Sequence, residues 1–301
     1  MTNNKGPHIA LLTEEKYIQP AETNWYIDQI LLEDGLLVSA LKSLGAKVTK
    51  VGWTQQDVDF SHFDAAIFSS IWDYYRYPVE FSEWLDRVEG QTRFFNSIAQ
   101  VRDNMDKRYL MRYADEGRAV VPTRLIEAGT SWSEKDWAGE LHSEHLVIKP
   151  VVGGAALDTF QWNVKDKFRD RQPMIKCLAE KDMIVQPFVP SIQSFGEVSH
   201  VLIGGTYTHS ILKRPKKGDY RVQDDHGGRV DSYQASLAEI ELALSWLEPL
   251  DEKPLYARVD LVKASVGGWW LGELELIEPE LWLRKNPPSA NLLAKKLLNS
   301  L

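Results

Sequence analysis

The sequence predicts a mixed α/β and α+β fold made of three units. Its first third alternates strand and helix patterns, an order that favours a parallel sheet with helices on its faces. Strand patterns become more frequent after residue 180, and a length of 301 residues suits two or three compact units. We therefore expect an N-terminal parallel-sheet domain over 1–98, a central unit over 99–180 and a C-terminal unit over 181–301.

The first unit opens with an apolar stretch at 8–13, which we interpret as a strand. A helix is expected near 33–44, because leucines and alanines recur there at three- and four-residue spacing and Gly45 ends the pattern. Two further apolar runs, at 46–52 and 63–69, complete a strand–helix–strand order.

The second unit is expected to begin with a helix from 105 to 116, capped by Asn104 and stopped by Gly117. Pro187 and Pro190 bracket a stiff connector to the third unit. Units of this kind favour ligands held in the clefts between them. The other expected elements are a helix at 166–179 and strands at 146–149, 158–162, 183–187, 197–204, 207–213, 256–263 and 269–277.

The composition disfavours several classes of function. Acidic residues outnumber basic ones by 43 to 35, and the net charge of -8 argues against nucleic acid or an anionic membrane as a partner. Cys177 is the single cysteine, which favours a reducing, cytoplasmic environment. The apolar stretch from Ile9 to Leu12 is too short for a secretion signal, and no run reaches the length of a membrane span.

Two strand patterns near the carboxyl terminus carry acidic side chains that suit a cation. Glu273 and Glu275 alternate in GELELIEP, so their carboxylates project from one strand face about 7 Å apart. Asp260, in YARVDLV, lies on another apolar strand that can pair with the first. Neighbouring carboxylates repel one another, whereas three oxygen donors suit Mg²⁺. The alternative is a solvated strand face with acidic decoration, and the residues alone leave both open.

A lysine and a glycine pair suggest an anion-binding loop. In KPVVGGAALDT, Lys149 ends a strand and Gly153–Gly154 allow backbone N–H groups to turn toward an anion. Most glycine pairs form plain turns, so this motif by itself is weak. Lys107 falls in the first turn of the expected helix, where the helix dipole disfavours a cation. It is either an ordinary surface residue or a charge aimed at a phosphate.

Two further segments have an uneven composition. KRPKKGDYRVQDDHGG at 213–228 is a basic, glycine-containing loop, which either closes over anionic substrate groups or is simply solvated. SSIWDYYRYPVEF at 69–81 places aromatic residues after a strand, where they line a pocket or form a packing corner. Neither metal-ligand spacing of histidines nor a nucleophile motif is present, so covalent catalysis is unsupported.

The order of these features resembles the ATP-grasp superfamily, which includes D-alanine–D-alanine ligase, glutathione synthetase and the ribosomal-protein glutamate ligases. The likeness covers nearly the whole chain. Five patterns resemble the branch that contains the D-cycloserine-forming O-ureido-D-serine cyclo-ligase, namely WDY at 72–74, DKRYL at 106–110, VQPFVPSI at 185–192, GDYRVQ at 218–223 and ELELIEP at 273–279.

The resemblance implies a three-unit ATP-grasp architecture in which two ATP-binding subdomains clasp the nucleotide. Lys107 and Lys149 would bind the α- and β-phosphates, and Glu197 the ribose. The other implied nucleotide contacts are Gly153, Gly154, Ala155, Gln186, Pro187, Phe188 and Val189. The implied catalytic residues are Lys213, Arg214 and Arg221, and the implied substrate contacts are Trp72, Asp73 and Tyr74.

The resemblance also implies two magnesium ions, replaceable by Mn²⁺, on Asp260, Glu273 and Glu275. Many ATP-grasp enzymes have asparagine where Glu275 stands, so it is open whether Glu273, Glu275 or Glu278 bridges the ions.

The implied activity is an ATP-dependent carboxylate–amine ligase that works through an acyl phosphate on a small amino-acid-like substrate. Ring closure of the D-cycloserine-forming type is one form of this reaction. The alternatives are a linear dipeptide or peptide-modifying ligase and a nucleotide-binding module without turnover. ATP and the carboxylate are the expected partners, without nucleic acid or membrane, and a homodimer or homotetramer is left open.

Overall fold

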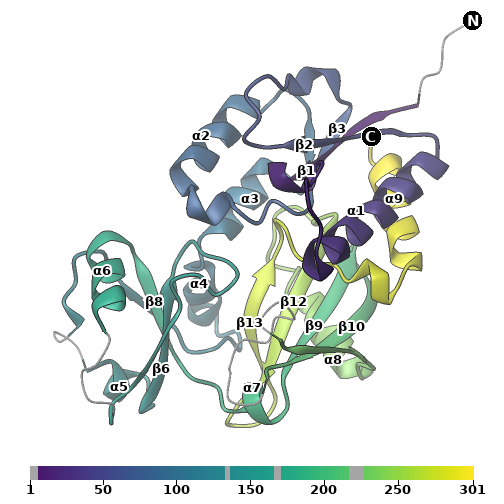
Figure 1. Cartoon of the computed structure of the whole chain (residues 1–301). Coiled ribbons are helices and arrows are strands. Elements are labelled where there is room, and N and C mark those ends of the chain that lie inside the picture. Colours follow the sequence, from purple (N-terminus) through teal and green to yellow (C-terminus); the bar gives the residue numbers. More distant parts are fainter. Residues whose placement is uncertain (1–5, 133–135, 166–170, 217–226) are drawn as a thin grey trace, which may run out of the picture.

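The computed structural model describes residues 6–132, 136–165, 171–216 and 227–301. Figure 1 shows an N-terminal α/β unit at the top, a small central unit at the lower left and a larger sheet at the lower right. Within the described ranges the strands form three sheets, and the predicted mixed α/β and α+β class is confirmed. Across the same ranges, every helix is too short or too polar to traverse a bilayer.

The N-terminal sheet has the strand order β2-β1-β3-β4, and its pairings are parallel, as predicted. Helix α1 begins at Trp25, earlier than predicted, because the Asn24 side chain caps it by accepting a hydrogen bond from the Ile27 N–H at 3.0 Å. Trp25 and Leu32 are apolar but exposed, so the first turns of α1 lack the regular apolar spacing that predicts a helix. The elements, with η for 3-10 helices, are β1 (His8–Thr13), η1 (Glu15–Tyr17), α1 (Trp25–Ser43), β2 (Lys47–Gly52), η2 (Phe60–His62), β3 (Ala65–Phe68), η3 (Tyr74–Arg76), α2 (Pro78–Val88) and β4 (Arg93–Phe95).

The helix predicted from 105 to 116 is present only as α4 (Tyr109–Asp115), and Gly117 follows it with a φ of 76°, as expected of a stop. The predicted start is wrong, because Met105 ends a separate helix, α3 (Ile98–Met105). Asp106 is extended between them, with φ −101° and ψ 114°, and its side chain accepts a hydrogen bond from the Arg108 N–H at 2.9 Å. Lys107 therefore lies in the junction between two helices and not in the first turn of one.

Asn104 does not cap a helix, as had been predicted, but lies within the last turn of α3. Its side-chain amide donates to the Leu274 carbonyl oxygen and its side-chain oxygen accepts from the Leu276 N–H, both at 2.8 Å. Caps and tertiary bridges use the same short polar side chains, so the sequence did not separate the two roles.

The central sheet is antiparallel, with the strand order β5-β8-β6-β7. β8 (Met183–Pro187) lies between β5 and β6, so it belongs to this sheet and not to the C-terminal unit in which a boundary at residue 180 had placed it. Residues 166–170, at the start of a predicted helix, lie outside the described residues. The other elements here are β5 (Arg124–Ile126), α5 (Trp137–Glu140), β6 (His145–Pro150), β7 (Phe160–Asn163) and α6 (Gln172–Glu180).

The C-terminal sheet is antiparallel, with the strand order β11-β10-β9-β12-β13. Asp260 on β12 lies directly opposite Glu273 on β13, so the predicted pairing of these two strands is confirmed. The elements are α7 (Ser191–Ser194), β9 (Glu197–Ile203), β10 (Thr206–Arg214), β11 (Arg229–Tyr233), α8 (Leu237–Ser245), β12 (Tyr256–Lys263) and β13 (Trp269–Glu275).

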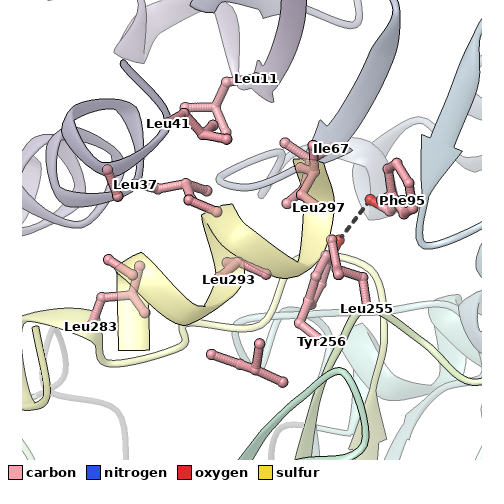
Figure 2. Packing of buried hydrophobic residues seen from close by; sticks show 14 of the residues in the cluster. Leu11, Leu37, Leu41, Ile67, Phe95, Leu255, Tyr256, Leu283, Leu293 and Leu297 are labelled. Carbon is pink, nitrogen blue, oxygen red and sulfur yellow. Dashed lines mark hydrogen bonds between the residues drawn. The ribbon is translucent and has the colours of Figure 1, made fainter. Parts of the chain in front are cut away.

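The last helix, α9 (Pro288–Asn299), packs beside α1, so the two ends of the chain share one core (Figures 1 and 2). Leu293 and Leu297 of this helix belong to the same buried cluster as Leu41 of α1 and Tyr256 of β12. Because α9 follows the C-terminal sheet, through η6 (Leu283–Lys285), it ties that sheet to the N-terminal unit and fixes the space between them.

A buried amide adds a polar bridge between the same two units. Asn96 is 2% exposed, and its side-chain N–H groups donate to the carbonyl oxygens of Tyr256 and Leu276 at 2.9 and 2.7 Å. Its side-chain oxygen accepts from the Leu255 N–H at 2.6 Å. These bonds hold the end of the N-terminal sheet against β12 and the segment after β13.

Candidate active site

A cleft of about 480 Å³ takes lining residues from all three units. Every residue predicted to contact the nucleotide lines it, although these residues come from the α3–α4 junction, β6, the loop after β6, β8, the connector after β8, and β9. They are Lys107, Lys149, Gly153, Gly154, Ala155, Gln186, Pro187, Phe188, Val189 and Glu197.

The connector after β8 forms an apolar wall of the cleft. Phe188 is buried and its ring stacks on His145, with ring centroids 4.4 Å apart. The Phe188 N–H donates to the His145 carbonyl oxygen at 2.8 Å, which holds the wall in place. The Gln186 side chain donates to the Thr123 hydroxyl at 2.8 Å and is therefore bonded within the protein. A rigid wall of this kind suits a planar ring system.

Two lysines of the cleft differ in their partners. Lys107 Nζ lies 3.0 Å from a Glu273 carboxylate oxygen and also donates to the Gly153 carbonyl oxygen. Burial alone would lower the pKa of Lys107, but the Glu273 carboxylate outweighs burial and the pKa is raised. The Lys149 ammonium has no ion pair or hydrogen bond within the described residues, and burial lowers its pKa. Lys149 is thus a partly buried cation that lines the cleft without a bonded counter-ion among the described residues.

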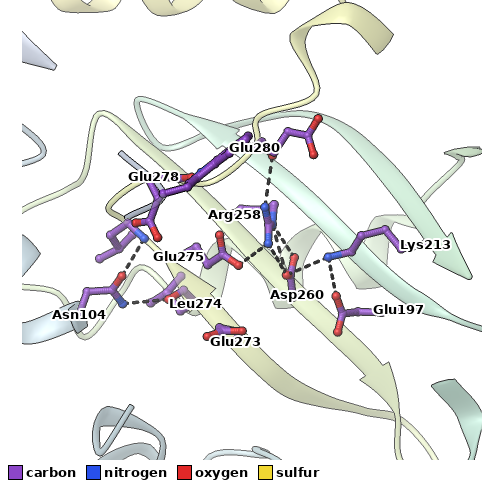
Figure 3. Close-up of polar contacts among 12 residues, drawn as sticks. Asn104, Glu197, Lys213, Arg258, Asp260, Glu273, Leu274, Glu275, Glu278 and Glu280 are labelled. Carbon is purple, nitrogen blue, oxygen red and sulfur yellow. Dashed lines mark hydrogen bonds and ion pairs between the residues drawn. The ribbon is translucent and has the colours of Figure 1, made fainter. Parts of the chain in front are cut away.

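Figure 3 shows Arg258 paired with Asp260 and Glu275, and Lys213 paired with Asp260 and Glu197. Asp260 is 2% exposed and pairs with Arg258 at 2.9 Å and Lys213 at 3.1 Å. Burial would raise the pKa of Asp260, but these two cations hold it far below its usual range. Glu275 pairs with Arg258, and Glu273 with the lysine described above. Burial, opposed by Arg258, raises the pKa of Glu275 to about 7.

The donor chemistry of these carboxylates fits Mg²⁺, which prefers oxygen ligands. Glu273 and Glu275 line the cleft, whereas Asp260 does not reach its surface. In the part of the chain that the structure describes, no three histidine, cysteine or acidic side chains are gathered as a finished metal centre. Lysine and arginine side chains pair with these carboxylates.

Of the residues predicted to be catalytic, the two that the structure describes, Lys213 and Arg214, do not line the cleft. Lys213 is buried and pairs with Glu197 at 2.5 Å as well as with Asp260, as Figure 3 shows, so it lies beneath the cleft and not on its surface. Arg214 is exposed and pairs with Asp231 at 2.9 Å. Arg221 lies outside the described residues, as do residues 217–226 of the predicted basic loop in general.

The predicted substrate residues divide into two groups. Trp72 and Tyr74 line the cleft, and the Trp72 indole N–H donates to the Glu278 carbonyl oxygen at 2.8 Å. Asp73 does not line it, because its carboxylate accepts a hydrogen bond from the Trp53 indole at 2.7 Å. Tyr75 and Arg76, from the aromatic segment that was expected to line a pocket or form a packing corner, also line the cleft. Further N-terminal residues that the sequence did not indicate line it as well, namely Glu14, Lys16, Tyr17 and Tyr26.

Arg258 is the main charged residue that sequence reasoning missed. It lines the cleft, pairs with both Asp260 and Glu275, and donates to the Glu280 carbonyl oxygen at 3.4 Å. The sequence contained its signal: Arg258 stands two residues before Asp260, on the same face of an otherwise apolar strand. Glu278 also lines the cleft, and burial raises its pKa to about 8.

Known proteins have sequences similar to that of this chain. The family described as D-cycloserine synthetase DcsG, N-terminal domain, matches residues 9–96. The cycloserine biosynthesis protein DcsG of Streptomyces lavendulae is 29% identical over 280 residues, which cover 88% of this chain and 92% of that relative.

Solved structures share the fold. The crystal structure of D-cycloserine synthetase DcsG matches with a TM-score of 0.85 and 26% identity, covering 97% of this chain and 99% of that one. A RimK domain ATP-grasp protein from Sphaerobacter thermophilus matches with a TM-score of 0.66 and 17% identity, covering 97% and 99% of the two chains. The chain is thus an ATP-grasp protein, a carbon–nitrogen ligase similar to D-cycloserine synthetase.

Proposed function

We propose that the chain uses ATP and Mg²⁺ to phosphorylate the carboxylate of a small amino-acid-like substrate and then joins the acyl group to a nitrogen. The supporting observation is the placement of Lys107, Lys149 and Glu273 in one cleft, with the Lys149 ammonium unpaired within the described residues. A cation in this state is stabilised by an anionic ligand, and the glycine loop beside it offers backbone N–H donors to phosphate oxygens.

Glu273 and Glu275 would hold Mg²⁺ at the cleft, with Asp260 as a third donor on the neighbouring strand. Bound Mg²⁺ would supply charge neutralisation of the phosphates, which lets a carboxylate anion approach them. Binding would free Lys107 from Glu273 to contact a phosphate. A count of two ions, and replacement by Mn²⁺, belong to this proposal.

The protein's own part is positioning and electrostatic stabilisation. A substrate carboxylate oxygen attacks the γ-phosphorus, which forms an acyl phosphate and releases ADP. The nitrogen then attacks the acyl carbon, phosphate leaves, and the nitrogen loses a proton. Lys149 and Arg258 line the cleft and would stabilise the transferred negative charge. The protein need not supply a covalent nucleophile.

The likeness to D-cycloserine synthetase favours a substrate whose nitrogen is part of the same molecule, so that the product is a ring. Trp72, Tyr74 and Tyr17, at the N-terminal end of the cleft, would enclose this substrate and exclude water from the acyl phosphate. With a single, partly buried cysteine, we expect the enzyme to work in the reducing cytoplasm. A homodimer or homotetramer remains a prediction for light scattering to check.

Release of ADP tests the proposal directly. The chain is incubated with ATP and Mg²⁺, with and without a panel of amino acids that includes O-ureido-D-serine. ADP release that depends on one amino acid is expected. A product lighter than that amino acid indicates ring closure, whereas a product that combines two molecules indicates a linear ligase. ATP binding without ADP release for any member of the panel would contradict a small amino-acid-like substrate.

A further inference from the structure

The glycine loop of the cleft rests against an aromatic ring of the N-terminal unit. A methyl carbon built on Gly154 would lie 2.6 Å from Tyr75 Cε1 and 2.7 Å from Tyr75 Cδ1. Non-bonded carbons attract best at about 3.5–4.0 Å, so this approach is strongly repulsive. At Gly153, the same carbon would meet Pro150 at an ordinary 3.5 Å. Of this glycine pair, only Gly154 is excluded from carrying a side chain by Tyr75.

Tyr75 is fixed in place by its surroundings. It is 8% exposed and belongs to the buried cluster that fills the N-terminal unit. Its ring meets that of Tyr74 edge-on, with centroids 5.7 Å apart, and Val152 of the glycine loop packs against the same cluster. A group inserted between Gly154 and the ring would therefore displace the loop more easily than the ring.

The loop itself depends on external support. Ala155 and Ala156 both adopt left-handed backbone conformations, with φ of 49° and 56°, which cost free energy for residues other than glycine. Such conformations persist where surrounding contacts hold them. On one side, the Lys107 N–H donates to the Val151 carbonyl oxygen at 2.8 Å, and the Lys107 ammonium binds the Gly153 carbonyl oxygen. On the other side, Tyr75 provides the contact at Gly154.

We infer that Tyr75 is a positioning residue for the glycine loop, and that its ring sets how closely the loop approaches the nucleotide phosphates. The inference rests on the proposed function, because it takes the loop to contact phosphates. It goes further in making nucleotide affinity depend on a residue of the N-terminal unit. Tyr75 directly follows Tyr74 on η3, so the turn that borders the substrate end of the cleft also supports the nucleotide loop.

A double-mutant cycle tests this contact through binding and not turnover. Calorimetry measures the Kd of a non-hydrolysable ATP analogue with Mg²⁺ for Gly154→Ala, Tyr75→Ala and the double variant. Overpacking of this kind corresponds to a loss of affinity for the ATP analogue of about tenfold in Gly154→Ala. In the Tyr75→Ala background, where the methyl group has space, the same substitution is expected to cost less than about twofold. The Kd of adenosine, which lacks phosphates, should be unchanged throughout.

Gly153→Ala is the matched control, since it restricts the same loop without meeting Tyr75. Its effect, whatever its size, should be equal in the wild-type and Tyr75→Ala backgrounds. If Tyr75→Ala does not fold, Tyr75→Leu takes its place, because it keeps an apolar side chain in the cluster. Equal losses from Gly154→Ala in both backgrounds, or no loss in either, would overturn the inference alone. Failure of the wild-type chain to bind the analogue would overturn the proposed function, and the inference with it.

Discussion

Lys107 and Glu273 form an ion pair of 3.0 Å that joins the α3–α4 junction to strand β13. One partner is a proposed phosphate ligand and the other a proposed metal ligand, so we expect the pair to separate when ATP and Mg²⁺ bind. Lys149 has no such pair within the described residues. The two lysines should therefore differ in stability experiments even though both are proposed to bind phosphate.

Lys107→Met and Lys149→Met test this difference. Lys107→Met leaves the Glu273 carboxylate without its cation and should lower the free energy of unfolding by about 3 kcal/mol. Lys149→Met removes a partly buried, unpaired charge and should leave the melting temperature unchanged or raise it. Thermal unfolding without ligands measures both. An equal fall in melting temperature in the two variants would show that Lys149 stabilises the folded structure as much as Lys107 does.

Lys149→Met should also separate phosphate binding from base binding. Because the lysine is proposed to contact phosphates only, its loss is expected to weaken ATP binding by about tenfold or more and to leave adenosine binding unaffected. Calorimetric titration of both ligands measures the difference. Equal losses for ATP and adenosine would contradict the phosphate role.

Glu273→Gln should reduce ADP formation by at least about a hundredfold at saturating Mg²⁺, since it removes a proposed ligand charge while keeping the side-chain shape. Glu241→Gln is the control, because Glu241 is exposed on α8 and has no role in the cleft. Asp260→Asn should behave differently and lose stability as well as activity, because it leaves Arg258 and Lys213 buried without their shared carboxylate. Near-normal turnover of Glu273→Gln would refute the metal assignment.

His200 predicts an acid-sensitive contribution to stability. It is 0% exposed, its Nδ1 lies 2.7 Å from the Ser210 hydroxyl, and burial lowers its pKa from 6.5 to about 4 against the attraction of Glu239 and Asp260. The unfolded chain therefore binds more protons between about pH 4 and 6.5, and the free energy of unfolding falls as the pH is lowered through that window. Protonation of His200 is expected to lower the free energy of unfolding by up to about 3 kcal/mol.

Denaturant titrations of wild type and His200→Gln at several pH values isolate this term from the titration of the carboxyl groups. The unfolding free energy of wild type minus that of His200→Gln should fall as the pH is lowered from 6.5 to 4, because only wild type contains the titrating imidazole. A difference that stays constant with pH would mean that His200 does not titrate as a buried neutral imidazole.

Asn96→Ala should weaken the contact between the N-terminal unit and the C-terminal sheet. It leaves the carbonyl oxygens of Tyr256 and Leu276 and the Leu255 N–H without their partner, which should cost about 2–4 kcal/mol of unfolding free energy. Asn291→Ala, on the exposed side of α9, is the control and should change stability by less than about 0.5 kcal/mol. Similar melting temperatures for the two variants would show that the bridge contributes little.

The local sequence determined the features that depend on neighbouring residues. Alternation along a strand placed Glu273 and Glu275 on one face, and the strand–helix–strand order determined the parallel N-terminal sheet. The pairing of the Asp260 strand with β13 also followed, because two apolar strands with a short turn between them form an antiparallel pair. The resemblance to a family then supplied the residues predicted to contact the nucleotide, and the fold brings them to one cleft.

The tertiary structure decided what depends on distant segments. β8 pairs within the central sheet, and α9 packs on α1, because burial of an apolar face selects partners that no local period specifies. The pairing of Arg258 with Glu275 was decided by the alignment of β12 with β13, which the local sequence does not specify. Lys107 left the expected helix since its backbone N–H bonds to Val151, far along the chain. Local propensity gives way at such positions, because hydrogen bonds and ion pairs to distant residues stabilise another conformation.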